Sequence, residues 1–210
     1  MNKTVLITGA SRGIGNATEE LIRLRGWQII APSRDELDFC RNDVDTFLLS
    51  PIDAMILCHG AWDCTDFREQ CEGDWEWQLY LRVIYPATLI RRFLIAPSIK
   101  MKSVVMVAST RGFIGGVNTG PYAAACAAQI AMMTGYAREY EGVRFNVVCP
   151  GLTDTDMGAE VIQTGGAKPN DVPQPREVVA MEIVRLIEGD DNGKVIRVVD
   201  GKASEAKWSW

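Results

Sequence analysis

The sequence predicts an α/β fold, a doubly wound parallel β-sheet in three layers that forms a single domain over residues 1–210. Short apolar runs alternate with helix-like segments, which is typical of β-α-β units. The runs are apolar at nearly every position, as in strands buried on both faces. A glycine-rich segment joins the first run to the first helix, where a doubly wound sheet binds its ligand.

The predicted elements follow one another in regular order. Strands are expected at Val5–Ile7, Gln28–Ala31, Ala54–Cys58, Val104–Ala108, Phe145–Val148 and Val195–Val199, the last of which closes the chain. Helices are expected at Ile14–Arg25, Trp75–Ile95, Tyr122–Tyr140 and Val178–Glu188. The segment Pro32–Asp53 has no room for a helix before a further strand, so a short strand near Leu37 and a helix over Asp43–Leu49 are expected there.

Charge and cysteine use restrict the partners. The net charge of −5 argues against nucleic acid or an anionic membrane, and no apolar run reaches the ~20 residues that span a bilayer. The six cysteines and the one histidine lack the spacing of metal ligands, so no metal site is predicted. Unpaired cysteines and the lack of a signal-peptide pattern after Met1 lead us to expect a cytoplasmic protein.

The glycine-rich segment is the strongest functional pattern. Thr8–Gly15 reads TGASRGIG, follows a strand and opens a helix. Glycines allow a sharp turn and the close approach of a pyrophosphate, and the helix N-terminus offers free N–H groups. The predicted nucleotide-binding residues are Gly9, Ser11, Arg12, Gly13, Ile14 and Gly15. A plain turn is the alternative interpretation.

This segment resembles TGxxxGxG, the cofactor fingerprint of the short-chain dehydrogenase/reductase family, which has a Rossmann-type fold. Other motifs of that family follow in order: Cys58–Ala61 stands at its Asn-Asn-Ala-Gly turn, Ser109 and Tyr122 fall at its catalytic spacing, and Pro150–Thr155 matches PGxxxT. The resemblance covers nearly the whole chain. It implies further cofactor contacts at Asp38, Cys58, His59, Gly60, Pro150, Gly151, Thr153 and Thr155. For His59, a purely structural role in the turn is the alternative.

The end of the second strand distinguishes the two nicotinamide cofactors. An acidic residue there binds the ribose hydroxyls of NAD, whereas a cation pairs with the 2′-phosphate of NADP. Arg34 occupies that position and Arg12 lies in the glycine-rich segment. Two guanidinium groups hold a phosphate through charge-assisted hydrogen bonds. The sequence therefore favours NADP over NAD, and the alternative is that Arg34 is a solvated loop charge.

The resemblance also implies a catalytic Ser, Tyr and Lys. In the family the Tyr is the acid/base, the Ser positions the substrate oxygen, and a Lys four residues after the Tyr holds the ribose and lowers the Tyr pKa. Ser109 and Tyr122 match the first two, but Cys126 stands at the Lys position, on the same helix face as Tyr122. The chain thus resembles an atypical member that lacks this Lys.

Arg82 is a second departure, because it matches an Asn position of the family. In one interpretation Arg82 extends into the volume of the missing Lys and restores positive charge beside Tyr122, which would favour the ionised Tyr. In the other, Arg82 points away or pairs with an acid and Cys126 is a small packed residue. A nucleophilic Cys126 would need a nearby cation or base.

The substrate pocket is expected beside these residues. Its candidate residues are Trp62, Asp63, Arg111, Phe113 and Leu152–Met157. The segment Asp156–Val172 has the composition of a mobile lid, and Trp75 and Trp77 are expected to be packing residues. Arg111 is either an attractor for an anionic substrate or an exposed loop charge. By resemblance, a homodimer or homotetramer is expected.

Two functions remain open at this point. The first is an NADP-dependent oxidoreductase that transfers hydride between nicotinamide and a small carbonyl or alcohol substrate, with Tyr122, Ser109 and an altered cation. The second is a catalytically impaired, NADP-binding regulatory or scaffold protein, since a fold does not fix a function. A sugar-nucleotide epimerase or dehydratase is a weaker third possibility.

Overall fold

A single β-sheet organises the computed structural model, which describes residues 3–37, 50–96, 101–168 and 170–207. Within these ranges the sheet has seven strands in the order β2-β1-β3-β4-β5-β6-β7. The strands are β1 Thr4–Thr8, β2 Gln28–Ile30, β3 Ala54–Leu57, β4 Ser103–Val107, β5 Arg144–Pro150, β6 Val195–Val199 and β7 Lys202–Glu205. β1 to β6 are parallel, and β7 is antiparallel to β6.

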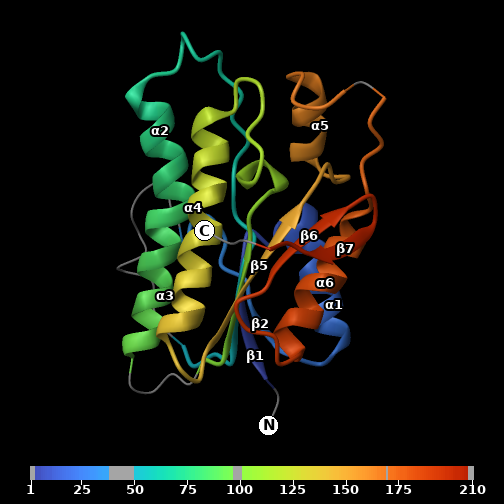
Figure 1. Ribbon diagram of the computed structural model, residues 1–210. Coiled ribbons are helices and arrows are strands. Elements are labelled where there is room, and N and C mark those ends of the chain that lie inside the picture. The colour runs from blue at the N-terminus through green and yellow to red at the C-terminus, as the bar shows by residue number, and fades with distance from the viewer. Residues whose placement is uncertain (1–2, 38–49, 97–100, 169, 208–210) are drawn as a thin grey trace.

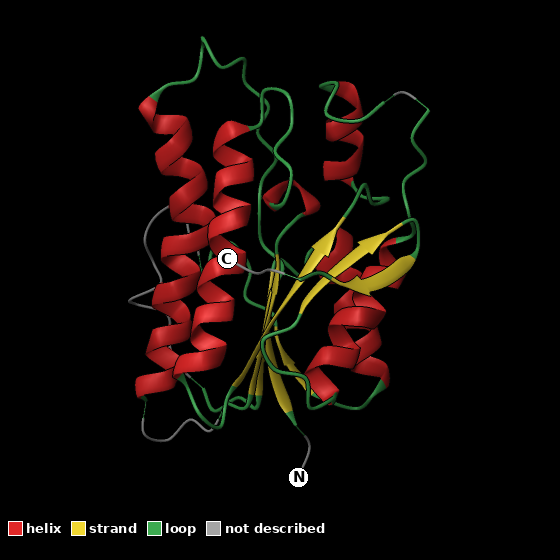
Figure 2. Ribbon diagram, in the orientation of Figure 1, coloured by secondary structure: helices red, strands yellow, loops and turns green. Residues whose placement is uncertain are grey.

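Helices cover both faces of the sheet (Figure 1). α1 and α6 pack together on one face, and α2, α3 and α4 lie on the other, which Figure 2 shows as red helices on either side of the yellow strands. The helices are α1 Gly13–Leu24, α2 Glu72–Leu79, α3 Tyr85–Ile95, α4 Gly120–Glu139, α5 Asp156–Gln163 and α6 Arg176–Glu188. The predicted three-layer, doubly wound α/β fold is confirmed. No helix in the described ranges has the length and apolar character needed to cross a membrane.

Each face of the sheet carries its own hydrophobic core, because successive side chains of a strand point to opposite faces. In β1, Leu6 packs in the core beneath α3 and α4, together with Phe93. Its neighbours Val5 and Ile7 pack in the other core with Ile183 of α6. Burial of each such side chain contributes ~1.5–3 kcal/mol, so the central strands fix the frame that carries the loops.

The strand order changes direction at β1, because β2 pairs with one edge of β1 and β3 with the other. In sheets of this kind the crevice for a ligand opens at that point, beyond the carboxyl ends of the strands. β1 ends at Thr8 and β3 ends at Leu57. The glycine-rich segment and the turn at Cys58–Ala61 therefore lie side by side at this crevice, in contact at Gly9 and His59.

The strand expected near Leu37 is not formed by the described residues. The Ser33 carbonyl accepts hydrogen bonds from the backbone N–H groups of both Glu36 and Leu37, so the chain makes a helical turn there. The Glu36 carboxylate also accepts from the Ser33 N–H at 2.8 Å, which is the reciprocal pattern of a helix start. The expected helix over Asp43–Leu49 lies outside the described residues.

Two further elements differ from the prediction. The chain does not close on β6, because Asp200 and Gly201 have positive φ angles of 50° and 72° and turn it back into the hairpin strand β7. The expected lid begins with helix α5, whose first turn is capped by Thr155. The Thr155 Oγ1 accepts the Gly158 N–H at 3.0 Å.

The long helix predicted over Trp75–Ile95 begins earlier, at Glu72, and contains a π-helical turn at Tyr80–Ile84 between α2 and α3. The expectation that Trp75 and Trp77 are packing residues is wrong, since they are 37% and 39% exposed. The reason is that α2 projects past the carboxyl ends of the strands, where no sheet lies beneath it (Figure 1).

Candidate active site

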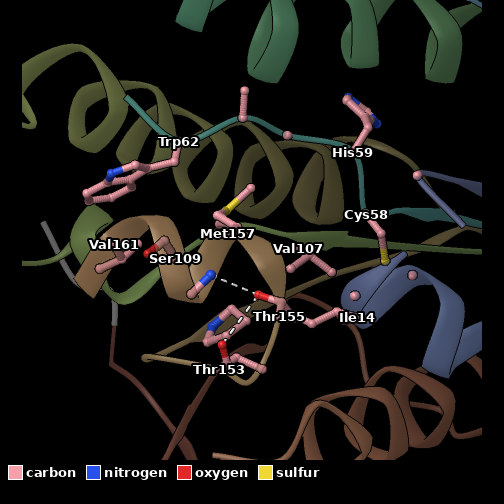
Figure 3. Close-up of a pocket in the computed structure, with 18 of the residues that line it drawn as sticks. Ile14, Cys58, His59, Trp62, Val107, Ser109, Thr153, Thr155, Met157 and Val161 are labelled. Atoms are coloured by element: carbon pink, nitrogen blue, oxygen red, sulfur yellow. Dashed lines mark hydrogen bonds between the residues drawn. The ribbon is translucent and has the colours of Figure 1, made fainter. Parts of the chain in front are cut away.

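The predicted site residues gather in one cavity of about 900 Å³ beyond the carboxyl ends of the strands (Figure 3). Asp38, the expected adenine contact, lies outside the described residues. All the other predicted cofactor residues line the cavity: Gly9, Ser11, Arg12, Gly13, Ile14, Gly15, Arg34, Cys58, His59, Gly60, Pro150, Gly151, Thr153 and Thr155. Ser109, Tyr122 and Arg82 line it as well, whereas Cys126 is fully buried beside Tyr122.

The glycine-rich segment is packed too tightly to accept side chains. A Cβ atom on Gly9 would lie 2.7 Å from the backbone nitrogen of His59, and one on Gly15 would lie 2.1 Å from the Gly9 carbonyl oxygen. Helix α1 then begins at Gly13 without any side-chain cap from Arg12. Its first-turn N–H groups have no helical acceptors, and the residues that carry them, Gly13, Ile14 and Gly15, line the cavity. This segment fits the pyrophosphate of a dinucleotide.

Two of the arginines that line the cavity are Arg12 and Arg34. Arg12 Nη1 pairs with the Asp156 Oδ2 at 3.3 Å, and both side chains are largely exposed. Exposed pairs of this kind contribute ~0–1 kcal/mol, so this contact holds Arg12 only weakly. Arg34 lines the same cavity, and Asp35 does not. The Glu36 carboxylate accepts a hydrogen bond from the Ser33 N–H, and its hydrogen bonds with Ser33 lower the pKa of Glu36.

Ser109 and Tyr122 meet at the centre of the cavity. Tyr122 is 5% exposed and Ser109 is 8% exposed. Burial raises the pKa of Tyr122 to about 12, while the positive charge of Arg82 and a hydrogen bond with Ser109 act in the opposite direction. Burial also raises the pKa of the Cys126 thiol, which is therefore protonated at neutral pH. This argues against a nucleophilic role for Cys126.

Arg82 is buried against Tyr122 and does not point away. Its guanidinium carbon lies 4.4 Å from the centre of the Tyr122 ring, and the side chain is 2% exposed. Nε donates to the Gln78 Oε1 at 3.0 Å, and Nη2 donates to the Ala61 carbonyl at 2.9 Å. Arg82 forms no salt bridge within the ranges that the structure describes. Its positive charge is thus directed at Tyr122 and the cavity.

Gly60 provides the space that this guanidinium group occupies. A Cβ atom at position 60 would lie 2.7 Å from Arg82 Nη2 and 3.0 Å from Cζ. Sequence reasoning missed this steric role, because glycine in a turn is explained equally well by the turn. It also missed Gln78 as an anchor, although the four-residue spacing of Gln78 and Arg82 on one helix was a usable signal.

His59 is held by the protein at both ring nitrogens. Nε2 lies 3.0 Å from the Leu81 carbonyl oxygen, and Nδ1 lies 2.6 Å from the Thr8 Oγ1. A carbonyl only accepts, so Nε2 carries the proton and the Thr8 hydroxyl donates to Nδ1. Burial and, to a lesser extent, the nearby charge of Arg82 lower the pKa of His59 to about 3, although the hydrogen bond with the Leu81 carbonyl acts in the opposite direction. The ring is therefore neutral at pH 7.

The substrate half of the cavity is mainly apolar. Trp62, Met157 and Val161 line it beside Ser109 (Figure 3). The Trp62 ring meets Tyr122 edge-on at 4.9 Å, and its Nε1 donates to the Thr164 Oγ1 at 2.9 Å. Trp62 thus connects Tyr122 to the residue that follows α5.

Three of the expected pocket residues do not face a substrate. The Asp63 Oδ1 accepts from the Thr65 hydroxyl, and neither Asp63 nor Phe113 lines the cavity. Arg111 does line it, but its guanidinium group donates to the Gly115 carbonyl at 3.1 Å and to the Gly166 carbonyl. Arg111 therefore fastens two loops together and does not extend into the cavity as a free charge.

Comparisons with known proteins agree with this fold. Residues 37–165 match the family described as short chain dehydrogenase. An uncharacterized oxidoreductase of Bacillus subtilis is 30% identical over 188 residues, which cover 75% of this chain and 77% of that protein. Acetoacetyl-CoA reductase of Synechocystis sp. is 28% identical over 177 residues, or 74% of each chain.

A solved structure of a small-chain dehydrogenase in complex with NADPH has the same fold, with a TM-score of 0.81 and 20% identity over 96% of this chain and 98% of that chain. These matches and the cavity together define a nicotinamide-dependent oxidoreductase. The chain belongs to the short-chain dehydrogenase family.

Proposed function

We propose that this protein is an NADP-dependent oxidoreductase that transfers hydride between the nicotinamide and a small carbonyl or alcohol substrate. In this proposal Tyr122 is the acid/base, Ser109 positions the substrate oxygen, and Arg82 takes the part of the family's lysine. The observation that carries it is the Arg82 guanidinium group, buried 4.4 Å from the Tyr122 ring centre without a salt-bridge partner among the described residues.

The chain's own groups would act on the substrate oxygen. Bound NADPH supplies the hydride that the carbonyl carbon accepts. Ser109 holds the carbonyl oxygen by a hydrogen bond, and Tyr122 donates its phenolic proton to that oxygen as it gains negative charge, which completes the alcohol. Arg82 then stabilises the phenolate of Tyr122 until a proton returns to it. Alcohol oxidation follows the same path in reverse, with the Tyr122 phenolate as the base.

The choice of NADP rests on Arg12 and Arg34. Both line the cavity, Arg34 after the end of β2 and Arg12 in the glycine-rich segment, where an exposed ion pair with Asp156 is its one salt bridge among the described residues. A 2′-phosphate would give both guanidinium groups a stronger partner than that carboxylate. The solved neighbour that holds NADPH supports a nicotinamide cofactor without deciding between its two forms.

The substrate half of the cavity supports an uncharged substrate. Its walls beside Ser109 are the apolar side chains of Trp62, Met157 and Val161. Both terminal nitrogens of Arg111 donate to backbone carbonyls, which holds its guanidinium group against two loops and away from an anionic substrate group. We therefore propose a small, mainly apolar ketone or aldehyde, or the corresponding alcohol.

The test is NADPH-dependent turnover of a carbonyl panel by the wild type, by Arg82→Gln and by Arg91→Gln. Arg91 is an exposed arginine on α3 and serves as the matched control. Acid–base assistance is typically worth ~10²–10⁴ in rate, so Arg82→Gln should lose at least about a hundredfold in kcat while Arg91→Gln stays at the wild-type value. Equal kcat in all three proteins would refute the role of Arg82.

A second candidate is an NADP-binding regulatory or scaffold protein with impaired chemistry. The observation in its favour is the burial of Tyr122, which raises the Tyr122 pKa to about 12 and disfavours the phenolate. Tight NADPH binding in a fluorescence titration, together with no turnover of any panel compound by the wild type, would select this candidate.

We also propose that the protein is a cytoplasmic homodimer. The α2–α3 helix exposes Trp77, Tyr80 and Ile84, which are 39%, 41% and 43% exposed. Large apolar side chains gathered on one helix are typical of an interaction surface. Sedimentation velocity of the full chain measures whether two copies associate.

A further inference from the structure

The π-helical turn that carries Arg82 has a local cause in the sequence. Pro86 has no backbone N–H, so it cannot donate to a carbonyl of the preceding turn. The Tyr85 N–H donates to the Tyr80 carbonyl, five residues back. In a regular α-helix the Tyr85 N–H would donate to the Leu81 carbonyl, but here it donates to the Tyr80 carbonyl. The next residue is Pro86, which has no N–H, so the Leu81 carbonyl has no donor within the helix.

His59 supplies the missing donor. Its Nε2 lies 3.0 Å from the Leu81 carbonyl oxygen, and its ring is oriented from the other side by the Thr8 hydroxyl, 2.6 Å from Nδ1. Leu81 is 7% exposed, so without His59 its carbonyl would be a buried acceptor that has lost its hydrogen bond. The imidazole of His59 thus completes the helix at the point where proline interrupts it.

The same turn is joined to the Cys58–Ala61 segment at two adjacent residues. His59 binds the Leu81 carbonyl, and Arg82, the next residue, donates to the Ala61 carbonyl at 2.9 Å. Two bonds from neighbouring residues fix both the position and the rotation of the π-helical turn. Without the first bond, one of these two bonds to the Cys58–Ala61 segment is lost, so the π-helical turn is free to shift and to carry Arg82 with it.

We propose that Pro86 and His59 are positioning residues for Arg82: the π-helical turn that proline creates and His59 completes holds the guanidinium group over the ring of Tyr122. This inference rests on the proposed catalytic role of Arg82. It assigns His59, a residue of the cofactor cavity, to the geometry of the acid/base pair.

Variants of His59 separate this role from general damage. In His59→Gln the side-chain amide nitrogen reaches about as far as Nε2 and keeps a donor for the Leu81 carbonyl, whereas His59→Leu removes the donor and keeps an apolar side chain. Loss of the donor leaves a buried carbonyl unpaired, and we expect His59→Leu to lose about tenfold to a hundredfold in kcat. His59→Gln should recover most of that loss.

Pro86→Ala tests the turn without touching the cavity, because Pro86 is not among the residues that line it. The new N–H lets the helix reclaim a carbonyl, so Arg82 should rotate away from Tyr122. We expect a loss in kcat similar to that of His59→Leu. The apparent pKa in the pH profile of alcohol oxidation should rise by about one unit, as a weaker cation favours the phenolate less. The Kd for NADPH should stay at the wild-type value.

Spectroscopy provides a readout independent of turnover. His59 is the only histidine of the chain, so its ring nitrogens give an unambiguous ¹⁵N NMR signature. The wild type should show the neutral Nε2–H form at pH 6, and Pro86→Ala should lose the hydrogen-bonded shift of that proton.

The outcomes are distinguishable from failure of the proposed function. If Arg82→Gln turns over like the wild type, the catalytic role of Arg82 is wrong and this inference falls with it. If Arg82→Gln is impaired but both Pro86→Ala and His59→Leu keep the wild-type kcat and pH profile, the positioning role alone is refuted.

Discussion

Replacing Gly60 with alanine should displace the Arg82 guanidinium group from Tyr122. A Cβ atom at position 60 would lie 2.7 Å from Nη2 and 3.0 Å from Cζ and Nη1, where ordinary contact needs 3.4 Å or more. The guanidinium group must therefore move by about 0.7 Å or more, in an interior packed too closely to absorb the change elsewhere. The Tyr122 ring and Gln78 block its other sides.

The cost can be worked from the contacts that such a shift disturbs. The shift moves the guanidinium group from its position 4.4 Å from the Tyr122 ring centre, and so weakens its attraction for an ionised Tyr122. Loss of the 2.9 Å charge-assisted bond to the Ala61 carbonyl costs about 1.5–3 kcal/mol. Since 1.4 kcal/mol corresponds to a factor of ten, we expect kcat to fall by about 10- to 150-fold.

The assay is steady-state turnover with a parallel fluorescence titration of NADPH. The Kd for NADPH should change little, because the nearest atoms to the new methyl group all belong to Arg82. The matched background is Arg82→Asn with Cys126→Lys, in which no guanidinium group fills the space beside Gly60. There, Gly60→Ala should cost less than about twofold. An equal loss in both backgrounds would refute the steric argument, because the methyl group would then act without Arg82.

Three other changes probe the cavity from different sides. His59 has a pKa of about 3 in the fold and ~6.5 when unfolded, so the unfolded state binds more protons below pH 6.5. The free energy of unfolding should therefore be highest above pH 6.5 and be about 2 kcal/mol lower at pH 5. Urea titrations should show this slope in the wild type and lose it in His59→Gln. Arg34→Asp should weaken NADPH binding by about 10- to 150-fold and leave NADH unaffected, and equal effects on both cofactors would contradict the assignment to the 2′-phosphate. Trp62→Ala removes the edge contact with Tyr122 and the hydrogen bond to Thr164, so the melting temperature should fall. The space that the indole leaves should let bulkier ketones become substrates. An unchanged substrate range would argue against Trp62 as a wall of the pocket.

The sheet could be predicted because buried parallel strands appear in the sequence as continuous apolar runs, such as Val104–Val107 in β4. The elements that escaped prediction lack that pattern. β7 is KASE and fully exposed, so it has no apolar face, although Asp200-Gly201 is a good hairpin signal. Helix α5 begins within a glycine-containing segment, and only its Thr155 cap marks the start.

The site was predictable in its membership but not in its geometry. Motif spacing placed Ser109, Tyr122 and the glycine-rich segment at one edge of the sheet, because the carboxyl ends of parallel strands meet there. Spacing could not decide which way Arg82 points. That depends on tertiary features, namely the space at Gly60 and the bond to the Ala61 carbonyl, which join segments about twenty residues apart.

The uncharged side chain of Cys126 is compatible with the buried positive charge of Arg82. The positive charge of Arg82 reaches both Tyr122 and the Cys126 thiol. A lysine at position 126 would bury a second cation beside the first, and two like charges ~5 Å apart repel by roughly 3 kcal/mol at an effective dielectric constant of 20.

Cys126→Lys alone should therefore destabilise the protein and fail to raise turnover. For a chain of this length ~3 kcal/mol corresponds to a melting temperature lower by about 6–12 °C. Cys126→Lys combined with Arg82→Asn should recover most of that loss, because one cation again faces Tyr122. Thermal unfolding and kcat of the single and double variants measure both effects. A Cys126→Lys protein as stable as the wild type and more active would show that Arg82 and a lysine are compatible, and that Arg82 does not occupy the lysine's place.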